Sequence, residues 1–339
     1  MEELSDPGGA RPGSRLKPSG VAVCRFSGDG EIALGAKGGI RMWAQSGVLA
    51  AGVLVTGLAA LLTFSGGGAD AASKRAVIAY GSERGGPVRV HVLGAATGNR
   101  SVLQTQGVGM DVEPAWSPDG RHLAIATSDA SGQDFDIAVV AANGSGRKRI
   151  TEGPAWDEEP AWSPDGRWIA FASDRDGDFE IYLVHPDGTG LRQLTTNVCE
   201  DTEPSWSPDG KRITWASRRG GFPHVWTMRA DGKLQRKLVR SLSSSPAWSP
   251  DGKRIAYVSE ADGDAEIFAV AAGGSGATQL TANDAIDDVG PTWSPDGLRI
   301  AFSSDRDGDA DIFEMAADGS AVHVLTSGIW MDETPAWRP

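Results

Sequence analysis

Acidic side chains recur at one fixed place in this sequence and are its most regular chemical feature. Five aspartates each stand three residues before a proline: Asp111, Asp157, Asp201, Asp288 and Asp332. Three of these prolines directly follow a glutamate: Glu113, Glu159 and Glu203. Carboxylate oxygens are the ligands that Ca²⁺ prefers, and they also pair with the Lys and Arg side chains of a partner. Either the aspartates together hold a cation or a basic segment, or each caps its own loop through backbone hydrogen bonds.

A second acidic set alternates along two short segments. Its members are Asp174, Asp176, Asp178, Asp305, Asp307 and Asp309. The spacing imitates the start of an EF-hand loop, which needs a bidentate glutamate at its twelfth position. That position holds His185 in one segment and Ala316 in the other, so neither segment is an EF-hand. A solvated hairpin turn and a loose calcium site both remain open, and we assign these six aspartates to a partner-binding surface.

The sequence contains no catalytic motif. Its five histidines fall at unrelated positions of the repeat described below: His91, His122, His185, His224 and His323. Such scatter does not predict a metal or catalytic cluster. The segment nearest to the G-x-S-x-G elbow of serine hydrolases runs from Gly273 to Ala277 and lacks the last glycine. We therefore assign no catalytic residue, and Ca²⁺ is the one cofactor considered. A lyase or hydrolase that uses a central channel is the alternative function.

The elements that must position the acidic residues belong to an internal repeat. Tryptophans open successive units 42 to 46 residues apart: Trp116, Trp162, Trp206, Trp248, Trp293 and Trp337. A period of this length is typical of a solenoid or a propeller. Five openings continue as Ser-Pro-Asp-Gly, for example from Ser163 to Gly166, which indicates a hairpin corner. A tryptophan that recurs in every unit indicates core packing between neighbouring units.

Each unit contains four short β-rich runs separated by turns. After the opening at Trp162, the runs are 168–172, 180–184 and 193–195, and four antiparallel strands form one propeller blade. Residues 76–105 supply only the last three strands of a unit, and residues 335–337 supply only an opening. The predicted fold is all-β: a six-bladed β-propeller of four-stranded antiparallel blades, the first blade closed by the C-terminal strand, preceded by an N-terminal apolar helix.

The antiparallel strand order predicts two different faces of the propeller. One face collects the connections into the first strand of each blade and the turns between its second and third strands, and therefore both sets of aspartates. Basic residues follow the corners on the opposite face and offset its acidic charge: Arg121, Arg167, Lys211 and Lys253. We expect the five aspartates before the openings to form a ring at one mouth of the channel that holds calcium or a basic segment.

The N-terminal region differs in composition. Residues 47–64 contain no charge, follow Arg41 and precede an Ala-Asp-Ala site that ends at Ala71, which are the parts of a secretory signal. A run of 18 apolar residues is also long enough for a membrane tether. We expect residues 1–46 to be disordered or an over-extended start and residues 47–71 to be a signal peptide or signal-anchor. Residues 72–339 then form a propeller that is secreted, periplasmic or membrane-anchored outside the cytoplasm.

The charge of the chain restricts its partners. The net charge is −13, and all of it lies after residue 71, because residues 1–71 contain six basic and six acidic side chains. An acidic body repels the phosphates of nucleic acids, so we expect no nucleic-acid partner. The partner that we expect is an envelope or secreted protein with a basic surface.

The openings and the turn from Asp174 to Asp178 resemble known propeller repeats. They are similar to the WD-like repeats of the TolB family and of the propeller domains in prolyl-oligopeptidase-type enzymes and tricorn. The resemblance covers residues 76–339 and implies the fold rather than one function, because this repeat serves many functions. TolB-type proteins carry a further N-terminal α/β domain, which we do not expect in residues 1–71.

Overall fold

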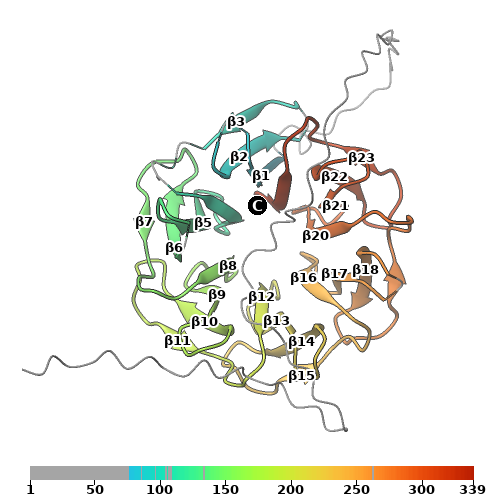
Figure 1. Ribbon diagram of the computed structural model, residues 1–339. Helices are drawn as coiled ribbons and strands as arrows, with labels where there is room; N and C mark the ends of the chain where they lie inside the picture. The colour runs from blue at the N-terminus through green and yellow to red at the C-terminus, as the bar shows by residue number, and fades with distance from the viewer. Residues whose placement is uncertain are drawn as a thin grey trace, which may run out of the picture.

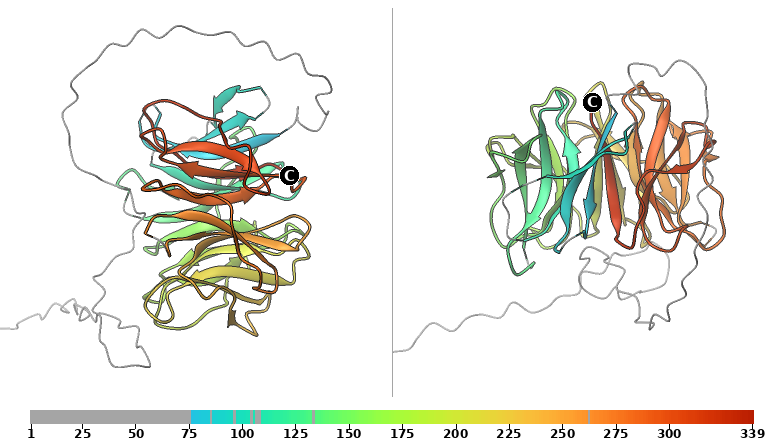
Figure 2. Two further views of the ribbon diagram at one scale, coloured as in Figure 1. Left: turned by 90° about the vertical axis from the view of Figure 1, so that its right-hand side faces the viewer. Right: turned by 90° about the horizontal axis from the view of Figure 1, so that it is seen from above.

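The computed structural model describes residues 76–339, apart from residues 85, 96, 104, 106–108, 133 and 262. These residues form six four-stranded sheets, which are arranged as blades around a central axis (Figure 1). Viewed from two other directions, the blades stand side by side in a disc (Figure 2). No helix in this part of the chain is long and apolar enough to cross a lipid bilayer. The predicted segments 1–46 and 47–71 lie outside the described residues.

The blades are numbered in chain order. Blade 1 contains β24 (Asp332–Trp337), β1 (Val77–Ser82), β2 (Arg89–Gly94) and β3 (Arg100–Val102), and blade 2 contains β4 (Asp111–Trp116), β5 (His122–Ser128), β6 (Phe135–Ala141) and β7 (Lys148–Arg149). Blade 3 contains β8 (Asp157–Trp162), β9 (Ile169–Ser173), β10 (Glu180–Val184) and β11 (Arg192–Gln193), and blade 4 contains β12 (Asp201–Trp206), β13 (Arg212–Ser217), β14 (His224–Arg229) and β15 (Arg236–Lys237). Blade 5 contains β16 (Ser244–Trp248), β17 (Arg254–Ser259), β18 (Glu266–Ala271) and β19 (Thr278–Gln279), and blade 6 contains β20 (Asp288–Trp293), β21 (Arg299–Ser304), β22 (Asp311–Ala316) and β23 (His323–Val324).

The first blade is built from both ends of the propeller, as predicted. Strand β24 pairs antiparallel with β1, with Trp337 opposite Ile78 and Asp332 opposite Ser82. The first strand of each blade contacts the first strand of the next blade, all the way from β4 to β24 and back to β4. These innermost strands therefore line the central channel, and the ring is closed.

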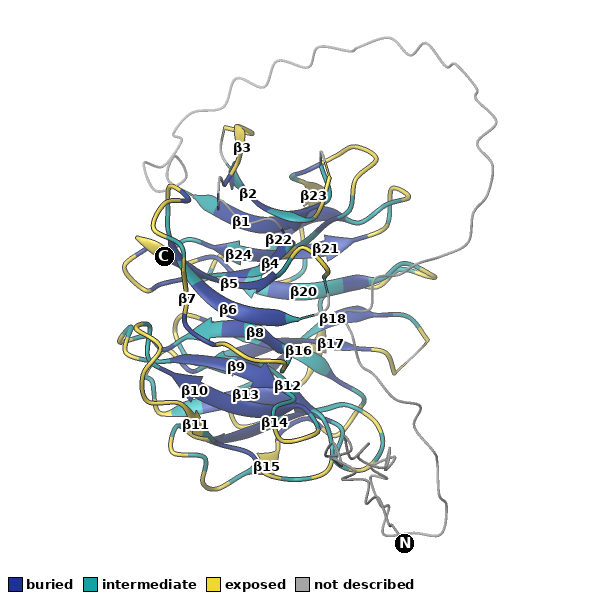
Figure 3. Ribbon diagram, turned by 60° about the vertical axis from the view of Figure 1, so that its left-hand side comes forward, coloured by how far each residue is buried: buried dark blue, intermediate teal, exposed yellow. Residues whose placement is uncertain are grey.

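Burial follows the position of a strand within its blade (Figure 3). All residues of β9 and β10 are buried, because the second and third strands lie between the neighbouring blades. The outermost strands are short and exposed, as in β7, which consists of Lys148 and Arg149. Short charged outer strands leave little free edge for pairing with another chain.

The recurring tryptophans pack between blades. Trp116 of blade 2 lies in one apolar cluster with Ala79 and Val90 of blade 1, which confirms the predicted core role. The corner that follows each tryptophan is also as predicted: the hydroxyl of Ser163 donates to Asp165 Oδ1 at 2.6 Å, and Gly166 has a φ of 70°. Trp162 and Trp206 are only partly buried, whereas the other four recurring tryptophans, those of blades 1, 2, 5 and 6, are at most 8% exposed.

The innermost strands are longer and less regular than the sequence indicated. Five of them begin at the aspartate of the opening rather than at the proline, and β16 begins at Ser244. Each contains a β-bulge, for example between Glu158 and Ala161 of β8. The residue before the proline adopts a positive φ in every blade: 52° for Glu113, 56° for Glu159 and 56° for Glu203. A non-glycine residue in this region is strained, and such strain persists only where its surroundings fix the backbone.

Candidate functional site

The five predicted metal-binding aspartates lie buried at the start of the innermost strands. Each is paired with an arginine of its own blade. The closest distances between a guanidinium nitrogen and a carboxylate oxygen are 3.1 Å for Arg147 and Asp111, 2.8 Å for Arg175 and Asp157, 2.6 Å for Arg219 and Asp201, 2.7 Å for Arg306 and Asp288, and 3.0 Å for Arg84 and Asp332. A charge-assisted pair of this kind supplies the positive charge that a buried carboxylate requires.

Hydroxyl groups also donate to three of the aspartates, and asparagine amides donate to Asp201 and Asp288. The Ser173 hydroxyl donates to Asp157 at 2.5 Å, and the Thr127 hydroxyl donates to Asp111 at 2.8 Å. Asp157 and Asp111 therefore tie the start of their innermost strands to the second strand of the same blade. Among the described residues, none of the five belongs to a cluster of three potential metal ligands. Their shared role in holding a cation stays a prediction.

Three glutamates line one side of the channel. Glu113, Glu159 and Glu203 occupy the third position of β4, β8 and β12. Glu113 Oε2 accepts the N–H of Glu159 at 2.7 Å, and Glu159 Oε2 accepts the N–H of Glu203 at 2.5 Å. Glu203 Oε2 in turn accepts the N–H of Ser245 at 2.5 Å. The carboxylates thus link four consecutive blades along the channel.

The corresponding positions of the other three blades carry no charge: Ser245, Gly290 and Thr334. At this position of the innermost strands, the carboxylates therefore come from three adjacent blades. Burial raises the pKa of Glu113 to about 7, and repulsion from Glu203 and Glu333 adds to this shift. Burial, followed by repulsion from Glu113, raises the pKa of Glu158 to about 9. Near neutral pH these carboxyl groups therefore require a proton, a cation or a basic partner.

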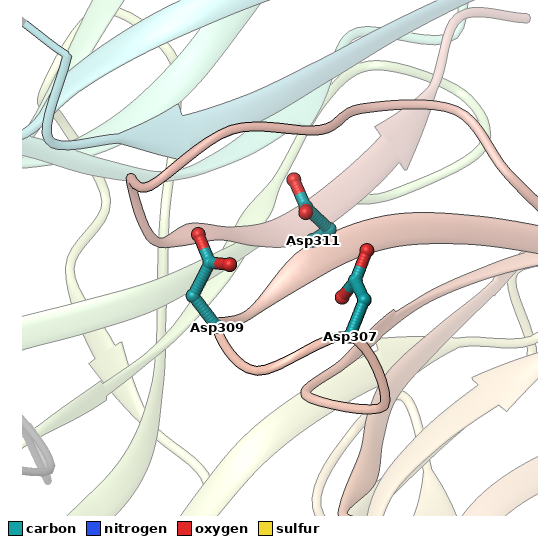
Figure 4. A group of neighbouring side chains, drawn as sticks. All are labelled: Asp307, Asp309 and Asp311. Atoms are coloured by element: carbon teal, nitrogen blue, oxygen red, sulfur yellow. The ribbon is translucent and has the colours of Figure 1, made fainter. Parts of the chain in front are cut away.

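A third acidic group lies in the turn between β21 and β22 of blade 6. Ligand oxygens of Asp307, Asp309 and Asp311 all lie within 4.8 Å of one another (Figure 4). Asp311 is fully buried, and its Oδ1 accepts the hydroxyl of Thr326 at 2.8 Å. The Oδ2 atoms of Asp309 and Asp311 are buried, and no described residue forms a hydrogen bond with them. Burial, with repulsion from its two neighbours, raises the pKa of Asp311 to about 6.

This cluster differs by one member from the predicted set. Asp307 and Asp309 are brought together, whereas Asp305 accepts the N–H of Asp287 at 2.9 Å instead. Asp311 is the first residue of β22 and continues the alternating spacing of the aspartates. Oxygen-only ligands in this spacing suit a hard cation such as Ca²⁺, which accepts irregular geometry.

The matching turn of blade 3 does not gather its carboxylates in this way. Asp174 accepts the N–H of Trp156 at 2.8 Å, and Asp176 accepts the side-chain amide of Gln193. The amide of Asn197 donates to Glu180 at 3.1 Å. In blade 6 the positions equivalent to these two amides hold Val324 and Gly328, which have no donor side chain. The six predicted partner-binding aspartates thus share one face but differ in their contacts.

These features define a class of protein: a six-bladed β-propeller with buried carboxylates on its innermost strands. Comparison with family models is more specific. The model of the TolB beta propeller domain matches residues 70–190, 175–240 and 235–339, and the chain belongs to this family. The predicted resemblance is thereby confirmed for the propeller part.

Solved structures show the same fold at low sequence identity. TolB from Acinetobacter baumannii is 23% identical with a TM-score of 0.68; the match covers 78% of this chain and 66% of TolB. A TolB-type protein from Agrobacterium tumefaciens is 24% identical with a TM-score of 0.62, over 78% of this chain and 99% of that protein. Hydrazine synthase from Kuenenia stuttgartiensis is 17% identical with a TM-score of 0.65, over 79% and 48% of the two chains. No curated protein sequence matches the chain at a significant level.

Proposed function

We propose that this chain is an extracytoplasmic scaffold that binds a basic segment of a protein partner at the acidic mouth of its channel. The observation that carries this proposal is the run of Glu113, Glu159 and Glu203 along three consecutive innermost strands. Within the described part of the chain, the hydrogen bonds of these carboxylates come from backbone N–H groups and one serine hydroxyl rather than from a Lys or Arg. Arg218 acts electrostatically on Glu203, and a basic side chain of the partner supplies further positive charge to the three glutamates.

Ca²⁺ is the cation that we propose for the same face. Asp307, Asp309 and Asp311 supply carboxylate oxygens at the spacing described above, and water completes the coordination. For the ring of five aspartates, the same role requires that their arginines move aside. The alternative of a lyase or hydrolase that works in the channel stays a prediction.

The location outside the cytoplasm is proposed from the sequence of residues 47–71. A cleaved signal gives a mature protein that begins near Ala72, whereas a retained one keeps the chain at a membrane through residues 47–64. N-terminal sequencing of the protein from each cell fraction distinguishes these results. Full-length protein that is soluble in the cytosol would contradict both.

Titration of a basic peptide into the full-length protein tests the binding proposal. The probe is the capped hexapeptide Gly-Lys-Arg-Lys-Arg-Gly, measured by calorimetry across a salt series with and without Ca²⁺. We expect the triple variant Glu113→Gln, Glu159→Gln, Glu203→Gln to bind about tenfold more weakly at low salt, or ~1.4 kcal/mol, and the difference to shrink at high salt. Equal affinity of the triple variant and the parent would refute the channel as the binding site.

The matched control removes the same charge from the opposite face. Asp187, Asp296 and Asp318 lie in corners and turns there, and each accepts a backbone N–H that an asparagine oxygen can also accept. The variant Asp187→Asn, Asp296→Asn, Asp318→Asn should bind the peptide as the parent does. If it weakens binding as much as the glutamate variant, net charge alone causes the effect.

A further inference from the structure

Arginines close most of the junctions between blades. The residue just before the buried part of the second strand is Arg212 in blade 4, Arg254 in blade 5 and Arg299 in blade 6. Each guanidinium lies over the tryptophan of the next blade. The distances to the ring centroid are 4.5 Å for Arg212 and Trp248, 4.6 Å for Arg254 and Trp293, and 5.1 Å for Arg299 and Trp337.

Two of these arginines also reach a backbone carbonyl of the next blade. Arg212 Nη1 donates to Ala272 O at 3.2 Å, and Arg254 Nη1 donates to Ala317 O at 3.0 Å. Trp116 is covered from another direction by Arg338, whose carbon Cζ lies 5.1 Å from the ring centroid. Stacking on a tryptophan face combined with a hydrogen bond from the edge is an arrangement that a planar guanidinium makes well.

The junction between blades 3 and 4 has no such arginine. Trp168 occupies the position equivalent to Arg212, and among the described residues no guanidinium lies over Trp206. A cavity of about 530 Å³ opens there instead, and its lining includes Trp168, Trp206, Pro164, Pro208, Leu183 and Ala230. The junction between blades 2 and 3 also lacks the arginine, since His122 holds the equivalent position.

Arg192 lies at this cavity without covering Trp206. Its guanidinium is 5.4 Å from the ring centroid of Trp168, which also stacks on His185 at 3.8 Å. Its Nη2 lies 3.3 Å from the carbonyl of Ala230, which is the equivalent of Ala272 and Ala317. The native chain therefore contacts the carbonyl of the junction, but the face of Trp206 has no cation over it.

Three carboxylates border the cavity: Asp165, Asp209 and Asp231. The Ser163 hydroxyl, with a backbone N–H, holds the pKa of Asp165 below its usual value, and the Ser207 hydroxyl has the same effect on Asp209. Both therefore stay ionised at neutral pH. Arg167 and Lys211 lie 3.9 Å from Asp165 and Asp209, and Arg229 lies 3.2 Å from Asp231. All three pairs are exposed, and such pairs are weak. A tryptophan face beside ionised carboxylates favours a flat cation.

We propose that the junction between blades 3 and 4 binds an arginine side chain of a partner protein. The partner's guanidinium stacks on Trp206, as the chain's own arginines stack on Trp248, Trp293 and Trp337. The cavity lies among the corners and the turns that lead to the outermost strands. It is therefore on the face opposite to the acidic mouth, and the proposal is independent of the function proposed for the channel.

Three capped tripeptides test this proposal on the full-length protein: Gly-Arg-Gly, Gly-Lys-Gly and Gly-citrulline-Gly. Binding is followed by the indole N–H resonances of Trp206 and Trp168 in NMR spectra. We expect the arginine peptide to shift both resonances and to bind about tenfold more tightly than the citrulline peptide, which has the same shape without the charge. Equal shifts with arginine and citrulline would overturn the proposal.

The variant Trp168→Arg places the missing arginine inside the junction. We expect it to lose peptide binding about tenfold or more and to keep or raise its melting temperature, because its own guanidinium then covers Trp206. The control His122→Arg makes the same kind of change at the neighbouring junction and should leave binding intact. If Trp168→Arg does not fold, Asp209→Asn with Asp231→Asn provides a second test and should weaken binding. Unchanged affinity in the folded variants would refute the site.

Discussion

Asp157 illustrates how this fold holds a buried carboxylate. It is 1% exposed, and Arg175 donates to its two oxygens at 2.8 and 2.9 Å. The sequence identified the aspartate but not its arginine, because that contact depends on a turn that folds back onto the start of the innermost strand. A signal was present nevertheless: three of the five pairs are separated by 18 residues, namely Asp157 and Arg175, Asp201 and Arg219, Asp288 and Arg306.

Replacement of this arginine should destabilise the protein. Arg175→Met leaves Asp157 buried without a counter-charge, and we expect the free energy of unfolding to fall by about 3 kcal/mol. The control Arg167→Met removes an exposed partner 3.9 Å from Asp165 and should change stability by less than about 0.5 kcal/mol. Urea denaturation gives both values. If added Ca²⁺ restores the stability of Arg175→Met, the aspartate can hold a cation; equal stability of the two variants would show that the pair is not structural.

At the scale of strands, the sequence repeat correctly predicted the order of the four strands in each blade and their antiparallel pairing. Glu180–Val184 is bounded as expected, because a turn flanks each end of this strand. The start of the innermost strands was missed, since the bulge breaks the alternation of side chains before the proline. The glutamates of the channel sit at that bulge. Their hydrogen bonds to the next blade occur at the bulge and were not predicted.

The strand that closes the ring should be essential for stability. Deletion of residues 335–339 removes the pairing of Trp337 with Ile78 and the cover that Arg338 provides for Trp116. We expect the melting temperature to fall by about 10 °C or more and the protein to aggregate, because β1 becomes a free edge. Deletion of Pro339 alone is the control and should have little effect. A truncated protein that melts with the parent would refute closure by β24. Thermal denaturation monitored by circular dichroism and light scattering provides the readout.

At the scale of the whole molecule, charge is distributed unevenly across the disc. Glu113, Glu159 and Glu203 come from adjacent blades, so repulsion accumulates on one side of the channel. The sequence indicated which face of the disc is acidic, because the order of the strands determines which turns lie on the same face. It did not indicate the cavity beside Trp206, although arginine follows Trp206, Trp248 and Trp293 by six residues and tryptophan follows Trp162 in its place. The substitution of Trp168 for this arginine is informative only once the arginines of the other blades are known to cover a tryptophan.

The pH dependence of stability should report this repulsion. The pKa of Glu113 is about 7 in the folded protein and near 4.5 when the group is unperturbed. A folded-state pKa above the unfolded value favours folding at low pH, so its contribution is complete below about 4.5 and lost as the pH rises to about 7. We expect the free energy of unfolding to decrease over that range and the Glu113→Gln variant to decrease less. Urea denaturation at several pH values measures this. Parallel curves for variant and parent would mean that Glu113 does not titrate there.

The pairing of β24 with β1 also constrains when the protein can finish folding. Strand β1 is the first described strand to be synthesised, yet its inner neighbour is the last one. During synthesis, blades 2 to 6 can form in succession while β1 waits with an unpaired edge. The ring therefore closes only after the final strand has left the ribosome. Until then the chain is an open array of blades rather than a closed ring.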